Sequence, residues 1–404
     1  MNLKICLILI SSAILLSACR APEGPVRLTA DVPEAQGWTM EVVLDGLEHP
    51  WSVVWLPNSD MLITERPGRL RWVRDGEMQS EPVSGVPEVF VDGQAGLLDV
   101  SIHPDFTENG FVYLTYAAGN DDANRTTLAR GIFSDGALTD VQSIFATNVA
   151  KTGNQHFGSR IAWLPDTTML VSIADGGNYI RFDGGWIREQ AQNTSNHLGT
   201  VVNLTEDGRP KASEYGAVGD TSQTSPSQDA AASSQVAESS IELPEIWTYG
   251  HRNIQGLAVD PVTGLVWANE HGARGGDELN LLEAGANYGW PIVTYSREYH
   301  FPRITRRTSK PGMVDPHVVW TPAQAPSGLA VYHGDAIPEW QGNIFSGGLK
   351  SGEVRRIILD GTSIAGEEKL TIGARVRDVR EGPDGYLYIL TDEENGRLIR
   401  IVPE

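Results

Sequence analysis

The chain has 404 residues, of which 40% are hydrophobic and 21% are charged, and its formal net charge is −21. This length is ample for one large domain, and 43 Gly with 23 Pro suit many turns between short strands. An acidic field of this strength repels nucleic-acid phosphates and anionic lipid surfaces, so it argues against both as partners. It suits a neutral substrate or a cationic protein partner, and it also serves solubility.

The N-terminus has the pattern of an export signal. Residues 1–18 contain one early lysine followed by an apolar run of signal-peptide length. The run ends in a Leu-Ser-Ala-Cys sequence, whose cysteine is Cys19 and which resembles a bacterial lipobox. We therefore expect a lipoprotein signal peptide over 1–18, a lipidated Cys19 and a flexible tether over 19–37. This predicts an exported, periplasmic-side protein that meets the membrane only through its lipid, at the outer membrane of a Gram-negative cell. A plain signal peptide or an uncleaved anchor is the alternative.

A weak internal repeat runs along the rest of the chain. In each unit a turn built on Pro, Asp, Asn or Gly precedes a short run that alternates apolar and polar residues. A spacing of about 60 residues is enough for one four-stranded blade. We predict an all-β, six-bladed β-propeller of four-stranded antiparallel sheets over 38–404, and a pair of β-sandwiches explains the repeat less well. The six units begin at Leu56, His103, Leu164, Val259, Tyr332 and Gly382.

The longest gap between units holds a low-complexity insertion. Residues 211–241 are rich in Ser, Ala, Gln and Thr and hold too little apolar surface to pack. We expect a surface loop there and assign it no chemistry.

Two motifs in the first half of the chain present polar side chains just before strands. Gln94 lies in Asp-Gly-Gln-Ala-Gly, which suggests a tight turn that exposes the amide. His156 lies in Gln-His-Phe-Gly-Ser-Arg at the mouth of a strand, where an imidazole is a candidate general base. Taken alone, a structural turn and a structural histidine are the commoner explanations of such motifs.

The richest cluster follows the insertion. It comprises a Tyr-Gly-His-Arg-Asn motif ending at Asn253, a glycine-rich stretch over 269–280 and an Asn-Tyr-Gly-Trp-Pro motif ending at Pro291. Glycine-rich backbone beside Asp277 and Glu278 offers carbonyl and carboxylate oxygens, which Ca²⁺ prefers. A zinc site is poorly supported, because the mature chain has no thiol beyond Cys19 and no His-Glu-x-x-His motif.

A cationic cluster lies near the C-terminus. Arg375 and Arg377 are two residues apart, so on a strand they share one face, and Lys350 precedes them in a Gly-Gly-Leu-Lys motif. In so acidic a chain this trio suggests a pocket for a polycarboxylate or a phosphate. Pairing of the arginines with local acids such as Asp378 or Glu381 is the alternative.

With these motifs in order, the sequence resembles the soluble aldose sugar dehydrogenases that depend on pyrroloquinoline quinone (PQQ). The resemblance runs from Leu44 to Val402. Each matching segment is weak alone, whereas their joint order on six propeller-like units is specific. The segments are HPWSVVWLP, GQAGLLDV, HFGSR, YGHRNIQGLA, EHGARGGDELNLL with NYGWP, and RVRDV.

The resemblance implies oxidation of an aldose to its lactone, with PQQ and Ca²⁺ as cofactors. His156 matches the general base that takes the anomeric hydroxyl proton as hydride passes to the quinone. Arg252 and Asn253 match residues beside the quinone oxygens, where Arg252 stabilises developing negative charge. Gln94 matches a polar contact close to substrate and base.

The resemblance also implies metal and cofactor contacts. Gly272 and Ala273 match the pair whose backbone carbonyls hold the Ca²⁺ that binds PQQ. Glu278 and Tyr288 match positions of a second, structural Ca²⁺ site. The cations that match those around PQQ are Lys350, Arg375 and Arg377.

Some positions depart from the family pattern. Ala273 stands where many relatives have Pro, which keeps a carbonyl ligand in a less rigid loop. Gln155 precedes the histidine where the glucose enzyme has an acid, so the substrate contacts there differ. The insertion at 211–241 has no family counterpart.

Two other functions stay open from the residues alone. One is a Ca²⁺-dependent propeller lactonase or hydrolase, which requires carboxylate and Asn ligands converging on a central metal and no anion pocket. The other is a non-catalytic extracellular binding propeller, which has no need of His156, Arg252 and Lys350 together. For a dehydrogenase, the partners we expect are a small sugar and an electron acceptor such as a c-type cytochrome or a quinone, with the acidic exterior docking a basic acceptor.

Overall fold

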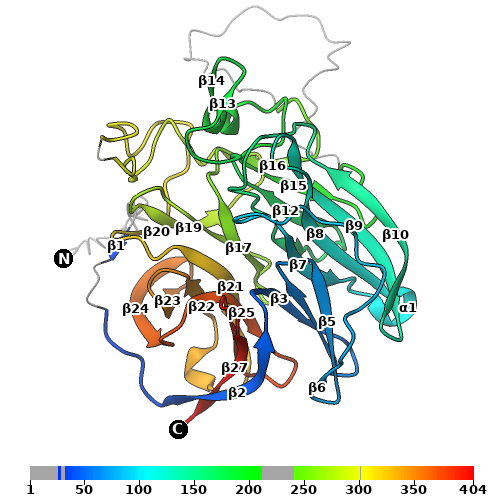
Figure 1. The fold of residues 1–404 in the computed structure, drawn as a ribbon. Coiled ribbons are helices and arrows are strands. Elements are labelled where there is room, and N and C mark those ends of the chain that lie inside the picture. Colours follow the sequence, from blue (N-terminus) through cyan, green and yellow to red (C-terminus); the bar gives the residue numbers. More distant parts are fainter. Residues whose placement is uncertain (1–25, 29–31, 212–240, 301) are drawn as a thin grey trace, which may run out of the picture.

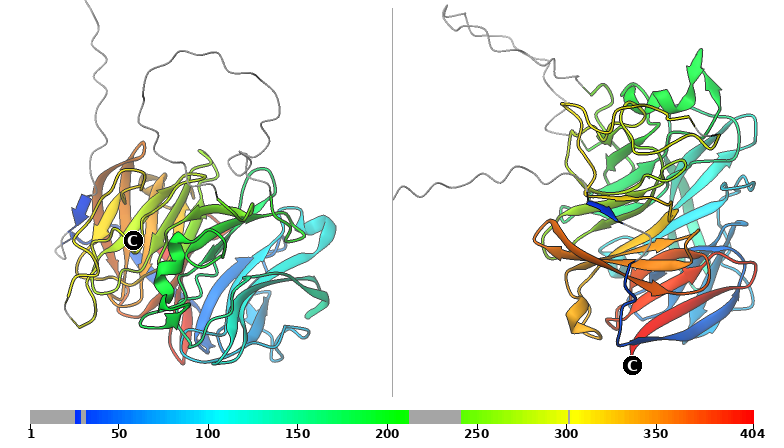
Figure 2. Two further views of the ribbon diagram at one scale, coloured as in Figure 1. Left: turned by 90° about the horizontal axis from the view of Figure 1, so that it is seen from above. Right: turned by 90° about the vertical axis from the view of Figure 1, so that its left-hand side faces the viewer.

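The computed structural model describes residues 26–28, 32–211, 241–300 and 302–404. Six four-stranded antiparallel sheets lie around a common axis, so the predicted all-β, six-bladed propeller is confirmed (Figures 1 and 2). The first three blades take the chain from residue 50 to residue 249. Their strands are β3 (Pro50–Trp55), β4 (Met61–Glu65), β5 (Arg69–Arg74), β6 (Glu77–Met78); β7 (Leu97–Ile102), β8 (Phe111–Gly119), β9 (Asn124–Ser134), β10 (Ala137–Ala146); and β11 (Ile161–Trp163), β12 (Met169–Ile173), β15 (Thr200–Leu204), β16 (Ile246–Tyr249).

The last three blades follow in the same pattern, from the innermost strand outward. Their strands are β17 (Ile254–Val259), β18 (Val266–Glu270), β19 (Asp277–Leu282), β20 (Val318–Trp320); β21 (Pro326–Tyr332), β22 (Asn343–Gly348), β23 (Glu353–Asp360), β24 (Ser363–Thr371); and β25 (Val376–Glu381), β26 (Leu387–Thr391), β27 (Gly396–Pro403), β2 (Trp38–Leu47). The remaining elements are short: β1 (Val26–Leu28), the hairpin β13 (Arg181–Phe182) and β14 (Gly185–Trp186), α1 (Phe106–Asn109), and the 3₁₀ turns η1 (Ile187–Gln192) and η2 (Pro338–Trp340).

The ring closes by pairing the two ends of the chain. β2 forms the outer strand of the last blade and runs antiparallel to β27, with Met40 opposite Ile401 (Figure 1). The second strand of each blade is packed between neighbouring blades, which explains why Met169–Ile173 and Leu387–Thr391 are buried along their whole length. The hydrophobic core is therefore divided into clusters between blades.

The repeated turn that the sequence shows is the hairpin between the first and second strand of each blade. Leu56 and Asp60, for example, close the turn between β3 and β4 through a backbone hydrogen bond of 2.8 Å. All six such hairpins lie at the end of the propeller where the innermost strands finish. The opposite face carries the starts of the innermost strands and the loops between second and third strands.

The predicted tether, residues 19–37, is described by the structure over residues 26–28 and 32–37. Val26–Leu28 pairs in parallel with Val318–Trp320, so β1 extends the fourth blade. Ala35 is 3% exposed in the hydrophobic cluster of the last two blades. The propeller therefore includes chain upstream of residue 38, because an apolar residue there covers a blade edge. The predicted signal peptide and Cys19 lie outside the described residues, as does the predicted insertion except for residues 211 and 241. Within the described chain, no helix is long and apolar enough to cross a membrane.

A buried charge network holds the innermost strands together below the site. Asp99 on β7 accepts hydrogen bonds from Ser52 on β3 (2.5 Å) and from the backbone N–H of Ile161 (2.8 Å). Arg160 lies 3.4 Å from Asp99 and 3.0 Å from Asp378, with all three side chains at most 2% exposed. A buried charge is tolerated only when it is paired, and this network pairs carboxylates and guanidinium groups from opposite blades.

Candidate active site

The candidate site lies on the face where the innermost strands begin. His156 and Asn253 precede β11 and β17, and Arg377 lies at the start of β25. In an antiparallel blade the loop between the second and third strands returns to the same face, and these loops bring His271 and Asp392. The topology thus gathers residues that are far apart in the sequence.

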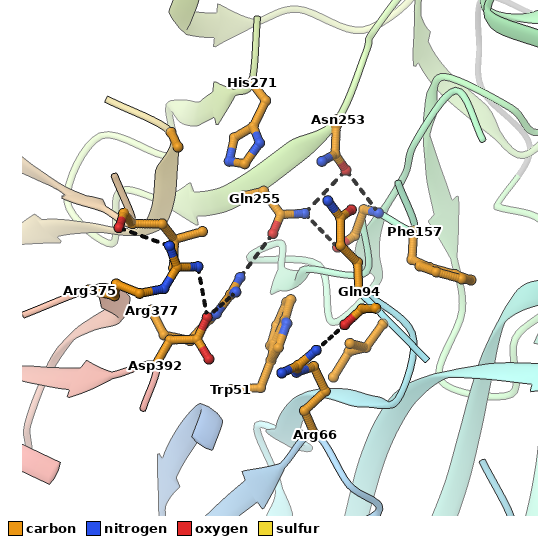
Figure 3. Close-up of a pocket in the computed structure, with 15 residues that line it drawn as sticks. Trp51, Arg66, Gln94, Phe157, Asn253, Gln255, His271, Arg375, Arg377 and Asp392 are labelled. Atoms are coloured by element: carbon orange, nitrogen blue, oxygen red, sulfur yellow. Dashed lines mark hydrogen bonds and ion pairs between the residues drawn. The ribbon is translucent and has the colours of Figure 1, made fainter. Parts of the chain in front are cut away.

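A cavity of about 250 Å³ occupies the centre of this face (Figure 3). Trp51 lies at its base, with the Arg160 guanidinium carbon 4.1 Å and the Arg377 guanidinium carbon 5.7 Å from its ring centre. The polar residues around it are Arg66, Gln94, Asn253, Gln255, His271, Arg375, Arg377 and Asp392.

The predicted cationic pair lines this cavity and shares one carboxylate. Arg375 and Arg377 both reach Asp392 Oδ2, at 3.2 and 2.9 Å (Figure 3). The carboxylates named in the sequence alternative are engaged elsewhere, since Asp378 pairs with Arg160 and Glu381 accepts the backbone N–H of His333. The two guanidinium groups hold the pKa of Asp392 well below its usual value even though burial acts in the opposite direction. The guanidinium groups of Arg375 and Arg377 and the carboxylate of Asp392 together carry a net positive charge. We call this side of the cavity the cationic wall.

Three guanidinium groups around the site keep an unused donor. The Nε atoms of Arg66, Arg252 and Arg377 are buried and have no hydrogen-bond partner in the described part of the chain. Burying a charged donor without an acceptor is costly, so the site is suited to a ligand with several anionic oxygens. Arg66 also donates to the carbonyl of Gly93, which fixes it on the cavity rim.

Amide side chains connect Arg377, on the cationic wall, to Asn253 and Gly158 on the other side of the cavity. Gln255 accepts from Arg377 Nη1 (3.2 Å) and donates to Asn253 Oδ1 (3.2 Å). The same Asn253 oxygen accepts the N–H of Gly158 at 3.3 Å. With its oxygen occupied, Asn253 turns its NH₂ group away from this network, on the cavity side (Figure 3).

His156 is held by two side chains and an unusual backbone conformation. Its φ of 52° lies in the left-handed region, and its N–H donates to Gln94 Oε1 at 2.8 Å. Its Nδ1 lies 2.6 Å from Asp175 Oδ1, with both side chains buried. Strain of this kind persists only where surrounding contacts fix it, as is common in active sites. Gln94, predicted to contact substrate and base, thus supports the base through its backbone.

The surrounding hydrogen bonds determine which imidazole nitrogen is basic. Asp175 can only accept, so Nδ1 carries the proton and Nε2 is the acceptor. Asn178 accepts from Arg252 Nη2 (2.9 Å), which turns its NH₂ group toward His156 Nε2 at 3.3 Å. Burial and then the Arg252 charge lower the pKa of His156, while Asp175 opposes them. The imidazole is therefore neutral and basic at Nε2.

A second cavity, of about 330 Å³, opens in front of this base. It is lined by His156, Asn178 and Arg252, and by two tyrosines at its mouth. Gln94 and His271 line both this cavity and the central one. A ligand on the cationic wall and a substrate at His156 would therefore be neighbours.

Comparison with known proteins decides the family. Residues 47–400 match the family model described as Glucose / Sorbosone dehydrogenase. The chain belongs to this family. Over 370 residues it is 52% identical to an uncharacterized protein of Synechocystis sp., covering 89% of this chain and 85% of that protein.

Two relatives of this chain are named as sugar dehydrogenases. The chain is 35% identical to the aldose sugar dehydrogenase YliI of Escherichia coli, covering 90% of this chain and 92% of the relative. It is 26% identical to quinoprotein glucose dehydrogenase B of Acinetobacter calcoaceticus, with 90% and 89% covered. The solved apo-form of the soluble aldose sugar dehydrogenase of Escherichia coli superimposes with a TM-score of 0.79, at 35% identity, over 91% of this chain and all of that one. The predicted family is confirmed.

The loop predicted to bind the catalytic metal directly follows His271, which lines both cavities. In this family member Gly272 and Ala273 line a groove of about 760 Å³ together with Lys350, which is exposed. The carbonyl of Gly272 accepts from Arg252 Nη1 at 2.7 Å. A Cβ at Gly272 would lie 2.3 Å from the carbonyl oxygen of Gly275, so this tight loop excludes any larger residue there. The structure thus brings Arg252, Lys350 and the two carbonyl residues to one place.

The residues predicted for a structural metal site share a small cavity of about 10 Å³, the size of one water. Glu278 and Glu270 both line it, and burial together with the Glu270 charge raises the pKa of Glu278 well above its usual value. Tyr288 also lines it, but its hydroxyl donates to the carbonyl of Leu281 at 2.8 Å. A Tyr288 ligand would therefore be its backbone carbonyl. Among the described residues, no group of three or more His, Cys, Asp or Glu is placed to hold a metal.

Sequence reasoning missed several functional side chains. Asp175, which contacts His156 Nδ1, occurs in an Ala-Asp-Gly-Gly sequence within the repeat unit that begins at Leu164. His271 lies beside Gly272 in a stretch already singled out, yet it lines both cavities, and burial lowers its pKa to about 3, which keeps it neutral. Arg66 and Asp392 carry no motif of their own. The feature that these residues share is their position, because each follows the second strand of a blade.

Proposed function

We propose that this protein oxidises aldose sugars to lactones with PQQ and Ca²⁺ as cofactors, His156 acting as the general base. The observation that carries the proposal is the position of the neutral His156 Nε2. It opens on a cavity that adjoins a second cavity with a cationic wall, and the two share Gln94 and His271.

The residues present fit a flat tricarboxylate quinone. The unused Nε donors of Arg66, Arg252 and Arg377 call for anionic acceptors, and the Trp51 ring offers an apolar base for a planar ligand. Arg375 and Lys350 add charge at the rim. The relative from Acinetobacter calcoaceticus is named a quinoprotein, which also supports this cofactor.

When bound, PQQ supplies a quinone that accepts hydride, and Ca²⁺ polarises its carbonyl. His156 removes the proton from the sugar hydroxyl at Nε2, and Asp175 stabilises the imidazolium that forms. Arg252 lies between the base and the Gly272 loop, where its charge favours developing negative charge. Trp290 packs against Arg252, with its ring centre 5.5 Å from the guanidinium carbon.

The Ca²⁺ sites are proposed at the carbonyls of Gly272 and Ala273 and, for a structural ion, at Glu278 with the Tyr288 backbone. Two carboxylates, Glu278 and Glu270, facing one water-sized cavity repel each other, and a divalent cation removes that repulsion. Added Ca²⁺ should therefore raise the melting temperature of the apo-protein, and Glu278→Gln should reduce this rise because it removes a ligand of the structural site. An identical Ca²⁺ response in Glu278→Gln would exclude the structural site.

Reconstitution tests the function directly. Purified apo-protein is mixed with PQQ and Ca²⁺ and assayed against a broad panel of aldoses with an artificial dye. We expect dye reduction that requires both cofactors. No dye reduction with any aldose, together with no PQQ binding by titration, would refute the proposal.

The base is tested by His156→Ala. We expect turnover to fall to background while PQQ still binds with wild-type affinity, because the cationic wall is untouched. Activity equal to the wild type would remove His156 as the base.

Export with a lipid at Cys19, periplasmic-side location and an electron acceptor such as a c-type cytochrome or a quinone remain parts of this proposal. Globomycin treatment and radiolabelled palmitate incorporation test the lipid. Cys19→Ala should abolish the label. The net charge of −21 supports docking of a basic acceptor, and a rate of cytochrome reduction independent of ionic strength would count against it.

A further inference from the structure

Two exposed tyrosines lie at the mouth of the cavity in front of His156. Tyr179 is 44% exposed and Tyr299 is 48% exposed, whereas every other Phe, Tyr or Trp that the structure describes is buried or half-buried. Both tyrosines line this cavity, although one follows β12 in the third blade and the other follows β19 in the fourth. Exposed apolar side chains scattered singly are ordinary on a protein surface, but two aromatic rings brought to one cavity indicate a binding site.

Tyr179 is held in its exposed position by its surroundings. Its φ of 56° lies in the left-handed region, which a bulky residue adopts only where neighbouring contacts fix it. Its hydroxyl donates to Glu298 Oε2 at 3.1 Å, and Glu298 Oε1 lies 2.7 Å from Arg188 Nη1. Because Glu298 directly precedes Tyr299, this ion pair anchors the segments that carry both tyrosines.

The Tyr179 ring also has two aromatic neighbours. Its centre lies 6.3 Å from that of Trp186, at an interplanar angle of 79°, and 6.0 Å from that of His300. These rings and the bond to Glu298 restrict the side chain, yet they leave nearly half of it exposed. The ring is therefore a fixed apolar surface at the cavity rather than a side chain free to turn away.

The direction in which a sugar enters brings a second ring to these tyrosines. His156 Nε2 takes the proton of the anomeric hydroxyl, so the ring that is oxidised enters with its reducing end first. A ring linked to its other end then lies toward the mouth, where Tyr299 lines both this cavity and the groove of about 760 Å³. The faces of a pyranose ring carry C–H groups, which pack against the apolar body of a tyrosine ring.

We propose that Tyr179 and Tyr299 form a subsite for a second, neutral sugar ring. The preferred substrates are then disaccharides and longer saccharides with a free reducing end. Arg188 and Glu298 beneath the subsite neutralise each other, which suits an uncharged ring. The inner end of the groove, with Gly272 and Ala273, belongs to the cofactor site. This inference rests on the proposed function, and it adds the class of substrate.

Glucose, maltose, cellobiose and lactose provide the test, because all four present a glucose ring for oxidation and three of them add a second ring. The protein is reconstituted with PQQ and Ca²⁺ and assayed with an artificial dye. We expect kcat/KM to favour at least one disaccharide over glucose, mainly through a lower KM. The best disaccharide identifies the linkage that places its outer ring on the tyrosines.

Tyr179→Gly removes the ring from a position whose positive φ glycine adopts freely, so the fold should be kept, and the melting temperature checks this. We expect the disaccharide-to-glucose ratio to fall about fivefold in Tyr179→Gly and in Tyr299→Ala. Tyr179→Phe keeps the ring and should keep most of the ratio. Phe182→Ala is the matched control, because Phe182 is a half-buried aromatic residue of β13 outside the linings of the cavity and the groove.

Three results would overturn the inference. The first is an equal kcat/KM for glucose and all three disaccharides. The second is a fall of the ratio in Phe182→Ala as large as that in Tyr179→Gly. The third is an equal loss for glucose and the disaccharides in both tyrosine variants, which would assign the tyrosines to the ring that is oxidised.

The two proposals can fail separately. If no sugar is oxidised, the dehydrogenase function fails, and saturation-transfer NMR of the three disaccharides with the apo-protein still tests the subsite, since it requires no turnover. Transfer to the protons of the non-reducing ring that is lost in Tyr179→Gly but kept in Phe182→Ala would support the subsite. Absence of such transfer in the wild type would refute it.

Discussion

Replacing Asp175 by Asn tests the base more sharply than removing His156, because it changes one atom and one charge. Asp175 Oδ1 faces His156 Nδ1 at 2.6 Å and the N–H of Gly177 at 3.1 Å, while Oδ2 accepts from Trp290 Nε1 at 2.8 Å. All three neighbours are donors. An amide has one NH₂ group, so in either orientation the variant places a buried donor against a donor.

The magnitude follows from these contacts. With the amide oxygen toward His156, the tautomer is kept and only the charge that stabilises the imidazolium is lost. With the NH₂ group toward His156, the proton moves to Nε2 and the base is lost. General-base catalysis contributes about 10²–10⁴-fold, and the corresponding Asp→Asn change in a serine-protease triad costs about 10⁴-fold. We expect Asp175→Asn to lower kcat about 10³-fold.

The assay combines kcat, PQQ titration and a pH profile. Asp175 opposes the effects that lower the pKa of His156, so its loss should lower that pKa further and move the acid limb of kcat to lower pH. Trp290→Phe removes one donor and should restore part of the activity when combined with Asp175→Asn. A kcat within threefold of wild type in Asp175→Asn, with PQQ bound, would refute the orienting role.

Three further changes probe other parts of the molecule. Arg377→Gln should weaken PQQ binding about tenfold in a fluorescence titration, because a charged donor is lost, whereas unchanged affinity would remove Arg377 from the cofactor site. Asp99→Ala should lower the free energy of unfolding by about 3–5 kcal/mol in guanidinium denaturation, and a loss below about 1 kcal/mol would show that the buried network is dispensable. Burial lowers the pKa of Lys151 to about 7, and the positive charge of Lys151 lowers the pKa of His156. Lys151→Met should therefore raise the pKa of His156 and move the acid limb of the kcat profile to higher pH. A shift to lower pH would contradict this.

The sequence predicts the fold well because the repeat and the fold have the same cause. Each blade needs a tight turn between its first two strands, and turns such as that from Leu56 to Asp60 require Pro, Asn or Asp in fixed places. The second strand of each blade is buried on both faces and therefore reads as a short apolar run, as in Met169–Ile173. Local chemistry is sufficient to find these features.

The site is predicted less completely because its residues lie at the other end of the strands. The loops there share no common turn, and each contributes one or two side chains of its own kind. His156, Arg375 and Arg377 were singled out from their own motifs, and the resemblance added Arg252 and a role for each residue. Asp175 and Asp392 were not, because a single aspartate in a loop shows no partner until the blades place His156 or Arg377 beside it.

The charge distribution joins these observations. The net charge of the chain suits neutral or cationic partners, yet cations gather around the candidate site, as the sequence pattern of Lys350, Arg375 and Arg377 predicted. Arg66, Arg375 and Arg377 line the central cavity around a single carboxylate, Asp392. A net charge averages over faces that meet different molecules, so the local sign at the cavity, rather than the sum, determines the ligand.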